Sequence, residues 1–230
     1  MSKSIILAGL AAAGLVATVL AGPARAEDTQ SPWQLRLRAL GVVPDTSGST
    51  VNVQGVPALS SPNSGLSIDN SIVPELDVSY FFTRNIAAEL VLGVTPHNIT
   101  GTGQLAGLNV GKAWLLPPTL LAQYHFTDFG RFQPYVGLGV NYTVFFSQTP
   151  GYTPNNNGLA VTNLTVNNSF GAAAQIGFDY MIDSHWGFNM DVKKLLLRPT
   201  YNATVNNTIP VSGTANIDPW LIGVGITYRF

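Results

Sequence analysis

The last eleven residues of the chain alternate between apolar side chains and small or polar ones. The apolar row is Trp220, Ile222, Val224, Ile226, Tyr228 and Phe230, and the row between is Gly223, Gly225, Thr227 and Arg229. Alternation with a period of two predicts a β-strand with two unlike faces. The apolar row begins with tryptophan and ends with aromatic rings, which is typical of a strand whose ends reach the two interfaces of a bilayer.

Seven further segments show the same alternation and are predicted to be strands of the same kind. They are Trp33–Val43, Pro74–Phe82, Ile86–Thr95, Lys112–Phe126, Phe132–Phe146, Phe170–Ile182 and Trp186–Leu196. With the last segment they make eight strands, the smallest even number that closes a barrel in a membrane. We therefore predict an all-β fold, an eight-stranded antiparallel up-and-down transmembrane β-barrel.

The connections between these segments alternate between short and long. The short ones are 83–85, 127–131 and 183–185, and the long ones are 44–71, 96–111, 147–169 and 199–217. In outer-membrane barrels the short turns face the periplasm and the long loops face outside. We therefore expect four long extracellular loops and both chain termini on the periplasmic side.

Residues 1–26 are predicted to be a secretory signal peptide. Lys3 precedes an apolar run that ends at Leu20, and Ala24 and Ala26 form a small-residue cleavage pattern. The run is short for a membrane-spanning helix, and no later stretch approaches the roughly 20 apolar residues that such a helix needs. Residues 27–230 are therefore expected to cross the outer membrane of a Gram-negative envelope as strands.

Composition and charge support a membrane protein and disfavour a nucleic-acid-binding one. Charged residues make up 10% of the chain, against roughly 25% in an ordinary soluble domain. The 11 basic and 12 acidic residues give no electrostatic basis for binding nucleic acid. The chain has no cysteine, so a closed ladder of backbone hydrogen bonds in lipid is the expected source of stability.

Four pieces of the sequence, in order, resemble the outer-membrane protein W family. They are Leu116–Leu120 leading to Gln123–Phe126, then Pro134–Tyr142, Asp218–Trp220 and Tyr228–Phe230. The family includes the alkane-uptake (AlkL-like) branch of oil-degrading bacteria. The resemblance implies a barrel with a narrow, largely hydrophobic channel that admits small apolar molecules and releases them sideways into the membrane. The first long loop, 44–71, departs from the family because it lacks the charge expected of a folded polar cap, which leaves the entrance undefined.

Charged side chains are expected to face the lumen, where an eight-stranded barrel has room for its own side chains or one slim ligand. The inward charged positions are Arg36, Arg38, Glu75, Asp77, Glu89, Asp179, Asp191, Lys193 and Arg229. We expect a salt-bridge network that fills the lumen, because unpaired buried charge is costly. A proton or ion relay is the alternative.

Towards the outer end the inward positions become apolar, and these are the predicted ligand-binding residues. They are Leu40, Val42, Leu115, Leu121, Phe145 and Leu195. A hydrophobic molecule could enter there but not pass the charged residues below, which favours a lateral exit. Pro117 and Pro118 are the predicted gate, because they remove two ladder donors from the fourth strand. The alternative is that Pro117 only ends a strand and Pro118 is a bulge.

We predict no catalytic site, metal site or cofactor. The histidines, His97, His125 and His185, fall at different levels and cannot assemble an ordinary metal site. His125 with Thr127 faintly resembles the histidine and hydroxyl of an outer-membrane lipid deacylase. An esterase would need a nucleophile bonded to the histidine with an acid behind it, and Thr127 lies in a predicted turn.

The expected function is passive uptake of small hydrophobic molecules across the outer membrane. The alternative is a filled structural or receptor barrel whose extracellular loops bind phage, bacteriocin or lipopolysaccharide. The expected partners are outer-membrane lipid and lipopolysaccharide, a small hydrophobic ligand, and the barrel-assembly machinery, which would meet the C-terminal strand ending at Phe230. Nucleic acid is not an expected partner.

Overall fold

The structure, a computed structural model, describes residues 31–155 and 157–230. The predicted signal peptide, residues 1–26, lies outside the described residues. Within them the regular structure is almost entirely strand, and the helical segment is the short 3-10 helix η1, Pro57–Leu59. No helix in this part of the chain is long and apolar enough to cross a membrane.

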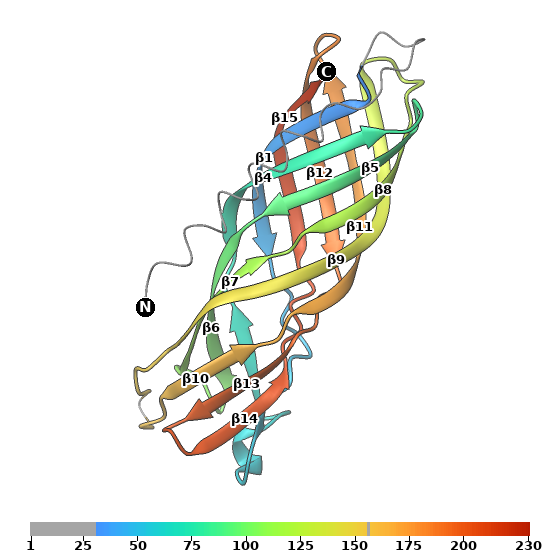
Figure 1. Cartoon of the computed structure of the whole chain (residues 1–230). Helices are drawn as coiled ribbons and strands as arrows, with labels where there is room; N and C mark the ends of the chain where they lie inside the picture. Colours follow the sequence, from blue (N-terminus) through green and yellow to red (C-terminus); the bar gives the residue numbers. More distant parts are fainter. Residues whose placement is uncertain (1–30, 156) are drawn as a thin grey trace.

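Eight antiparallel strands close a barrel in the order in which they follow along the chain (Figure 1). They are β1 (Trp33–Val43), β4 (Ser71–Phe81), β5 (Ile86–Gly93), β8 (Thr119–His125), β9 (Phe132–Pro150), β11 (Ser169–Met181), β12 (Trp186–Leu195) and β15 (Trp220–Arg229). Each pairs with the next, and β15 returns to β1, so the ladder closes on itself. The predicted up-and-down barrel is confirmed.

The predicted strand Lys112–Phe126 is divided in two. β7 (Asn109–Leu116) and β8 are separated by Pro117 and Pro118. A proline has no backbone N–H to donate to a ladder, so two in succession interrupt the strand. β8 pairs with β5 inside the barrel, whereas β7 pairs with β6 beyond it.

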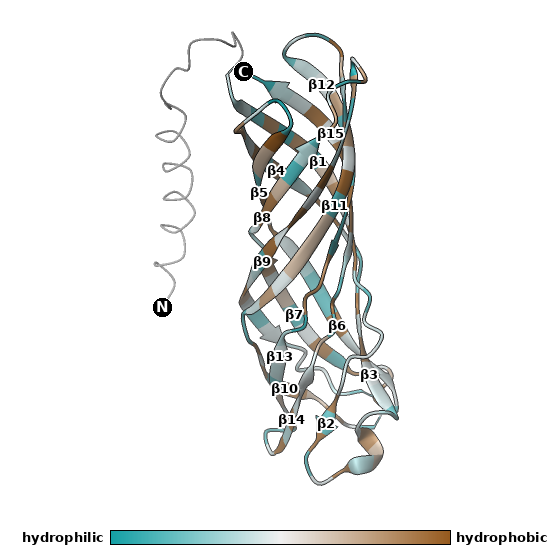
Figure 2. Cartoon of the chain, turned by 90° about the vertical axis from the view of Figure 1, so that its right-hand side faces the viewer, coloured by the Kyte–Doolittle hydropathy of each residue, from teal (hydrophilic) through white to brown (hydrophobic). Residues whose placement is uncertain are grey.

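The barrel strands turn apolar side chains outward and polar side chains inward. Along them, hydrophobic and hydrophilic residues alternate in Figure 2. The exposed row includes Leu37, Leu120, Leu138, Ile176 and Ile222, and the fully buried inward set includes Gln34, Asn141, Asn189 and Thr227. This sidedness suits a sheet in lipid, because acyl chains meet only apolar side chains and the backbone is satisfied within the ladder.

Aromatic rings gather at the end of the barrel that carries the short turns, which we call the turn end. Trp33 packs edge-on against Tyr80 with ring centroids 4.9 Å apart, and Trp186 packs against Tyr228 at 4.7 Å. Phe230, the last residue, packs edge-on against Tyr228 at 4.9 Å. Rings at one level of a barrel are typical of a membrane–water interface.

Beyond the opposite end of the barrel the chain forms a second β-structure, which we call the extension (Figure 1). Its strands are β2 (Asn52–Val53), β3 (Ser64–Ile68), β6 (Thr95–Gly103), β7, β10 (Val161–Val166), β13 (Thr200–Val205) and β14 (Ile209–Thr214). β3, β6 and β7 form a sheet with the second half of β9. β10, β13, β14 and β2 form another sheet.

Much of the sequence expected to form loops is therefore folded. Strands occupy large parts of 44–71, 96–111, 147–169 and 199–217. Residues 44–71, whose lack of charge left the entrance undefined, contain β2, η1 and β3. The extension to which they belong is held by apolar side chains rather than by charge. Its core contains twenty buried residues, among them Val51, Val53, Leu66, Val110, Leu164 and Val211. Burial of each large apolar side chain contributes about 1.5–3 kcal/mol before entropy is counted.

Candidate functional site

The part of the lumen nearer the turn end is filled by a cluster of buried ion pairs that we call the charged plug. Its members are Arg36, Arg38, Glu75, Asp77, Glu89, Asp179, Asp191 and Lys193. Each of these residues is at most 2% exposed. They come together because each occupies an inward position of an alternating strand.

Arg36 on β1 lies at the centre of the part of the plug nearer the turn end. Its Nη2 lies 2.7 Å from Asp179 Oδ2, and its Nε donates to Asp179 Oδ1 at 3.1 Å. The guanidinium also pairs with Glu89, and it donates to Ser79 Oγ at 3.0 Å. This two-point contact with Asp179 fixes the arginine in the lumen, as a bidentate pair does elsewhere.

Arg38 and Lys193 organise the part of the plug nearer the extension. Arg38 pairs with Glu75 at 2.9 Å, with Asp191 at 2.8 Å and with Asp77. Lys193 Nζ lies 3.0 Å from Glu75 Oε1 and 2.8 Å from Asp191 Oδ2. Every charge in this group has an opposite charge in contact, which buried ions require.

Gln175 joins the two parts of the plug. Its amide donates to Glu89 Oε1 at 2.9 Å and to Asp191 Oδ2 at 2.7 Å. Gly223 makes room for this packing, because a Cβ there would lie 2.6 Å from Asp191 Oδ1 and 3.0 Å from Arg38 Cδ. The plug is therefore one connected network that spans the lumen.

Arg229 does not belong to the plug, although it is one of the nine charged positions expected there. It lies closer to the turn end, where it donates to Gln34 Oε1 at 2.7 Å and to Gln133 Oε1 at 3.2 Å. Without Arg229 the plug holds three cations and five carboxylates.

An apolar layer covers the plug on the side of the extension. Four of the six predicted ligand-binding residues meet there, namely Leu40, Val42, Leu121 and Leu195, together with Val73, Val91, Ala173 and Leu221. The other two, Leu115 and Phe145, lie further out in the core of the extension. They are inward as expected, but β7 and β9 carry them past the end of the barrel.

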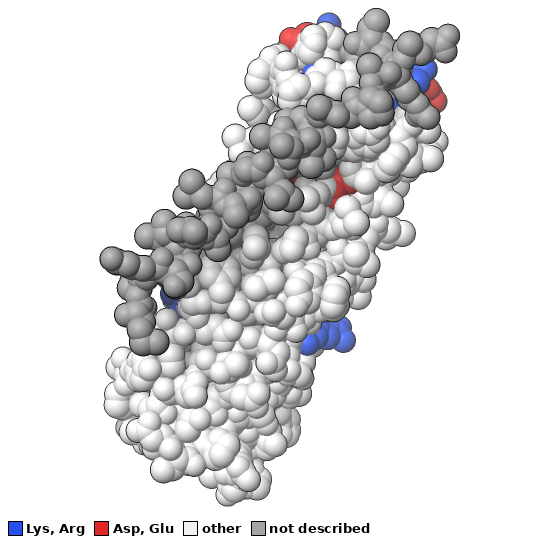
Figure 3. Space-filling model, viewed as in Figure 1, with Lys and Arg blue, Asp and Glu red and all other residues white. Residues whose placement is uncertain are grey.

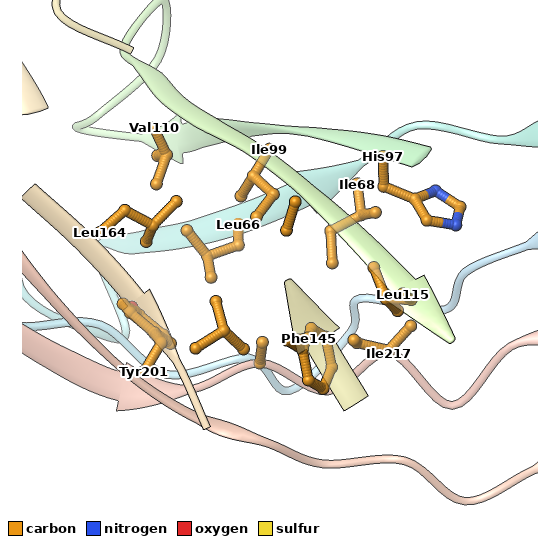
Figure 4. Close-up of a pocket in the computed structure, with 13 residues that line it drawn as sticks. Leu66, Ile68, His97, Ile99, Val110, Leu115, Phe145, Leu164, Tyr201 and Ile217 are labelled. Atoms are coloured by element: carbon orange, nitrogen blue, oxygen red, sulfur yellow. The ribbon is translucent and has the colours of Figure 1, made fainter. Parts of the chain in front are cut away.

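Two apolar cavities lie in the extension. The inner cavity is lined by Leu66, Ile68, His97, Ile99, Val110, Ala113, Leu115, Phe145, Leu164, Val166, Tyr201, Ala215 and Ile217 (Figure 4). Its volume for water-sized molecules is about 20 Å³, and that of the outer cavity, which reaches Leu59, Leu159 and Ile209, is about 30 Å³. Each has room for only one or two waters, so the extension is a nearly filled apolar column.

The two cavities meet at Leu66, Val110 and Tyr201, which line both. Tyr201 is held in place by its hydroxyl, which donates to the carbonyl oxygen of Thr50 at 2.9 Å. Sequence reasoning missed these residues because they lie in segments expected to be loops. Short alternating pairs such as Leu66 with Ile68 were the available signal, since their period of two predicts strand.

The ladder of the barrel wall is interrupted beside the apolar layer, between β5–β6 and β7–β8. Ladder pairing ends at Val91 with Thr119 and resumes at Thr95 with Leu115. In the described chain, residues 92–94 and 116–118 make no ladder pairs with each other. We call this interruption the wall gap.

Pro117 and Pro118, the predicted gate, form one side of the wall gap. Their carbonyl oxygens accept hydrogen bonds from the side-chain amide of Asn141 in the lumen, at 3.1 and 3.3 Å. The backbone N–H of Tyr142 donates to the Pro118 carbonyl at 3.1 Å. The prolines are therefore tied to β9 while their link to β5 and β6 is interrupted.

The three histidines lie apart, as their positions indicate. His125 is buried in the lumen, where its ring stacks on Tyr135 at 4.8 Å and Nε2 lies 3.0 Å from Gln123 Oε1. His185 lies in a turn at the turn end, and His97 lines the inner cavity. The described residues contain no group of three or more side chains suited to hold a metal ion.

Known proteins match most of the chain. The family model of the OmpW family matches residues 30–230. The outer-membrane protein y4mB of Sinorhizobium fredii (strain NBRC 101917 / NGR234) is 51% identical over 225 residues, which are 95% of this chain and 91% of that protein. Outer membrane protein AlkL of Ectopseudomonas oleovorans is 29% identical over 74% of this chain and 70% of that protein.

A solved structure shares the fold. The crystal structure of the outer membrane protein OprG from Pseudomonas aeruginosa matches with a TM-score of 0.75 at 28% sequence identity. The match covers 87% of this chain and 97% of that chain.

Proposed function

Because the chain belongs to the OmpW family, it is a β-barrel of the outer membrane, and we propose that it admits small hydrophobic molecules by passive uptake. The extension faces the outside, and the turn end faces the periplasm, as the short turns of such barrels do. The molecule enters the apolar column of the extension, reaches the apolar layer and leaves through the wall gap into the bilayer. No chemical step is involved.

The observation that carries this proposal is the position of the wall gap, which lies next to the apolar layer on the extension side of the plug. Val91, the last paired residue before the gap on β5, belongs to the apolar layer. A molecule in that layer meets buried ion pairs ahead of it and an interrupted ladder beside it. Over the whole path, transfer from water to lipid gains about 0.8 kcal/mol for each CH₂.

The absence of charge on much of the extension supports uptake of apolar molecules through it. Figure 3 shows charged side chains at the turn end and around the middle of the molecule, and none on the visible face of the outer part of the extension, at the bottom of the view. Residues 46–68, 95–111 and 199–217 contain no Asp, Glu, Lys or Arg. A hydrophobic molecule therefore meets no charged group on its way to the inner cavity from these segments.

The partners proposed for the barrel are lipids of the outer membrane, including lipopolysaccharide. Where the barrel meets the extension, Lys112 lies over the ring of Trp114 at 5.4 Å, and Lys194 lies over Trp220 at 4.8 Å. Cations beside interfacial aromatic rings are suited to anionic headgroups. The apolar face of β15, which ends beside Phe230, is the part proposed to meet the barrel-assembly machinery.

A filled receptor barrel is the second candidate, and the small size of the two cavities favours it. With about 20 and 30 Å³ free, side chains of the extension must move before a ligand of several carbons fits. A receptor needs no such movement, because its outer surface alone meets the partner.

The two functions are separated by an influx measurement. The purified protein is inserted into vesicles with lipopolysaccharide in the outer leaflet, and influx of octane and of potassium ions is followed. We expect faster octane influx without ion conductance, because the plug closes the lumen to ions. Octane influx equal to that of protein-free vesicles contradicts uptake and leaves the receptor function.

A further inference from the structure

His97 marks a polar point in the otherwise apolar column. Of the residues that line the inner cavity, only His97 and Tyr201 carry polar side-chain atoms. The Tyr201 hydroxyl uses its proton in the bond to Thr50. His97 is 3% exposed, and Figure 4 shows it at the end of the cavity near Leu115, with the nitrogen-bearing edge of its ring turned away from the cavity.

That end of the cavity is the end nearest the barrel. Leu115 lies two residues before Pro117 on the way into β8. On the opposite side of the wall gap, His97 lies two inward positions beyond Gly93. A molecule that moves from the inner cavity to the wall gap therefore passes the edge of the His97 ring.

The hydrogen bonding of His97 fixes which ring nitrogen carries the proton. Nδ1 lies 2.8 Å from the carbonyl oxygen of Asp69. A carbonyl oxygen only accepts, so Nδ1 is the donor and Nε2 of the neutral ring keeps a free lone pair. No hydrogen bond to Nε2 is formed by any residue that the structure describes.

The surroundings also keep the ring neutral. The Asp69 carboxylate lies 3.6 Å from Nδ1, but its two oxygens accept from the backbone and the side chain of Asn98, each at 2.7 Å. Burial is the largest influence and lowers the pKa of His97, although Asp69 partly offsets it. A neutral ring is the form that can accept a hydrogen bond at Nε2.

We propose that His97 Nε2 accepts a hydrogen bond from the hydroxyl group of a small monopolar molecule, an alcohol or a phenol, as it moves from the inner cavity to the wall gap. This inference rests on the proposed uptake function and narrows its substrate class. A hydroxyl that enters an apolar passage without a partner is strongly disfavoured, and one acceptor there removes much of that cost. Anionic heads do not fit, because an anion needs a hydrogen-bond donor and the one N–H of the neutral ring already donates to the Asp69 carbonyl oxygen.

Competing influx of two matched molecules tests the inference. Octane and 1-octanol are offered to the same vesicles, and the ratio of their protein-dependent influx rates is measured for each variant. The ratio does not depend on how many barrels are folded and inserted, so a variant that inserts poorly still reports. We expect His97→Phe to lower the octanol-to-octane ratio about two- to tenfold, the effect of one lost neutral hydrogen bond.

Two further variants decide the cause. His97→Gln keeps a side-chain carbonyl acceptor and is expected to restore most of the ratio, whereas His185→Phe, at the turn end, is expected to leave it unchanged. If His97→Phe leaves the octanol-to-octane ratio unchanged, or if His97→Gln lowers it as much as His97→Phe does, the role of His97 is overturned while uptake stands. If the unaltered protein accelerates neither molecule, the uptake function itself fails.

Discussion

Lys193 Nζ on β12 lies 3.0 Å from Glu75 Oε1 on β4, two strands that are separated in the barrel by β15 and β1. The contact therefore crosses the lumen rather than running along its wall. In the uptake that we propose, this contact helps to close the passage to water and ions, and the wall gap is the exit for a molecule held in the apolar layer.

Lys193→Met is expected to destabilise the barrel by about 3–5 kcal/mol, because it leaves Glu75 and Asp191 buried beside an excess of carboxylates. The measurement is the free energy of unfolding in urea with the protein in lipid. Lys112→Met is the control, because Lys112 is exposed and is expected to change stability by less than about 1 kcal/mol. Equal effects of the two variants would show that the plug contributes no more than a surface charge.

Replacement of both Pro117 and Pro118 by Val is expected to slow octane influx. The N–H restored at position 117 faces the wall gap and allows the ladder to continue there, whereas the one restored at position 118 faces β9. Pro118→Val alone is the comparison, since the Pro118 carbonyl accepts from Tyr142 on β9 and a donor restored at this position faces the same strand. The effect is expected to be smaller there, and unchanged influx in the double variant at equal insertion argues against the gate.

Tyr201→Ala is expected to join the inner and outer cavities and to raise the influx of bicyclic molecules relative to octane. The ring lines both cavities and is anchored to Thr50. Tyr201→Phe keeps the ring and serves as control. Selectivity that is the same in both variants and in the parent protein would show that the column does not select by width.

Stability of the extension is expected to fall as the pH is lowered below about 6.5, the ordinary pKa of histidine. Burial lowers the pKa of folded His97, so the unfolded chain binds a proton that the folded chain excludes. The Asp69 carboxylate at 3.6 Å is the charged group in contact. Hydrogen exchange of the β6 amides, corrected for intrinsic rates, is expected to be faster at pH 5 than at pH 7.5. His97→Gln is expected to lose this difference.

The barrel could be predicted from sequence because its pattern is local. Each strand, such as Trp220–Arg229, alternates over enough residues to show both its conformation and its buried face. The charged residues of the plug followed from the same alternation. Arg229 shows the limit, because alternation gives the direction of a side chain and not its height in the lumen, which depends on strand tilt and register.

The extension could not be predicted in the same way. Its strands are short, and several pair with partners far away in the chain, as Val53 does with Val211. Short segments of this kind are made stable by the core they enclose rather than by their own pattern. The wall gap was accessible from sequence only on the side of Pro117 and Pro118, because nothing in residues 92–94 shows that their pairing is interrupted.

The central claim, that hydrophobic molecules leave through the wall gap, is tested most directly by a reversible lock. The chain has no cysteine, so an introduced pair can be oxidised and reduced in one sample. The first pair is at Val94 and Leu116, which the register on either side of the gap places opposite each other. A second pair at Leu90 and Leu120, opposite each other where the ladder is intact, is the control. The account predicts that oxidation stops octane influx only in the first pair and that reduction restores it. Full influx with the first pair oxidised would contradict it.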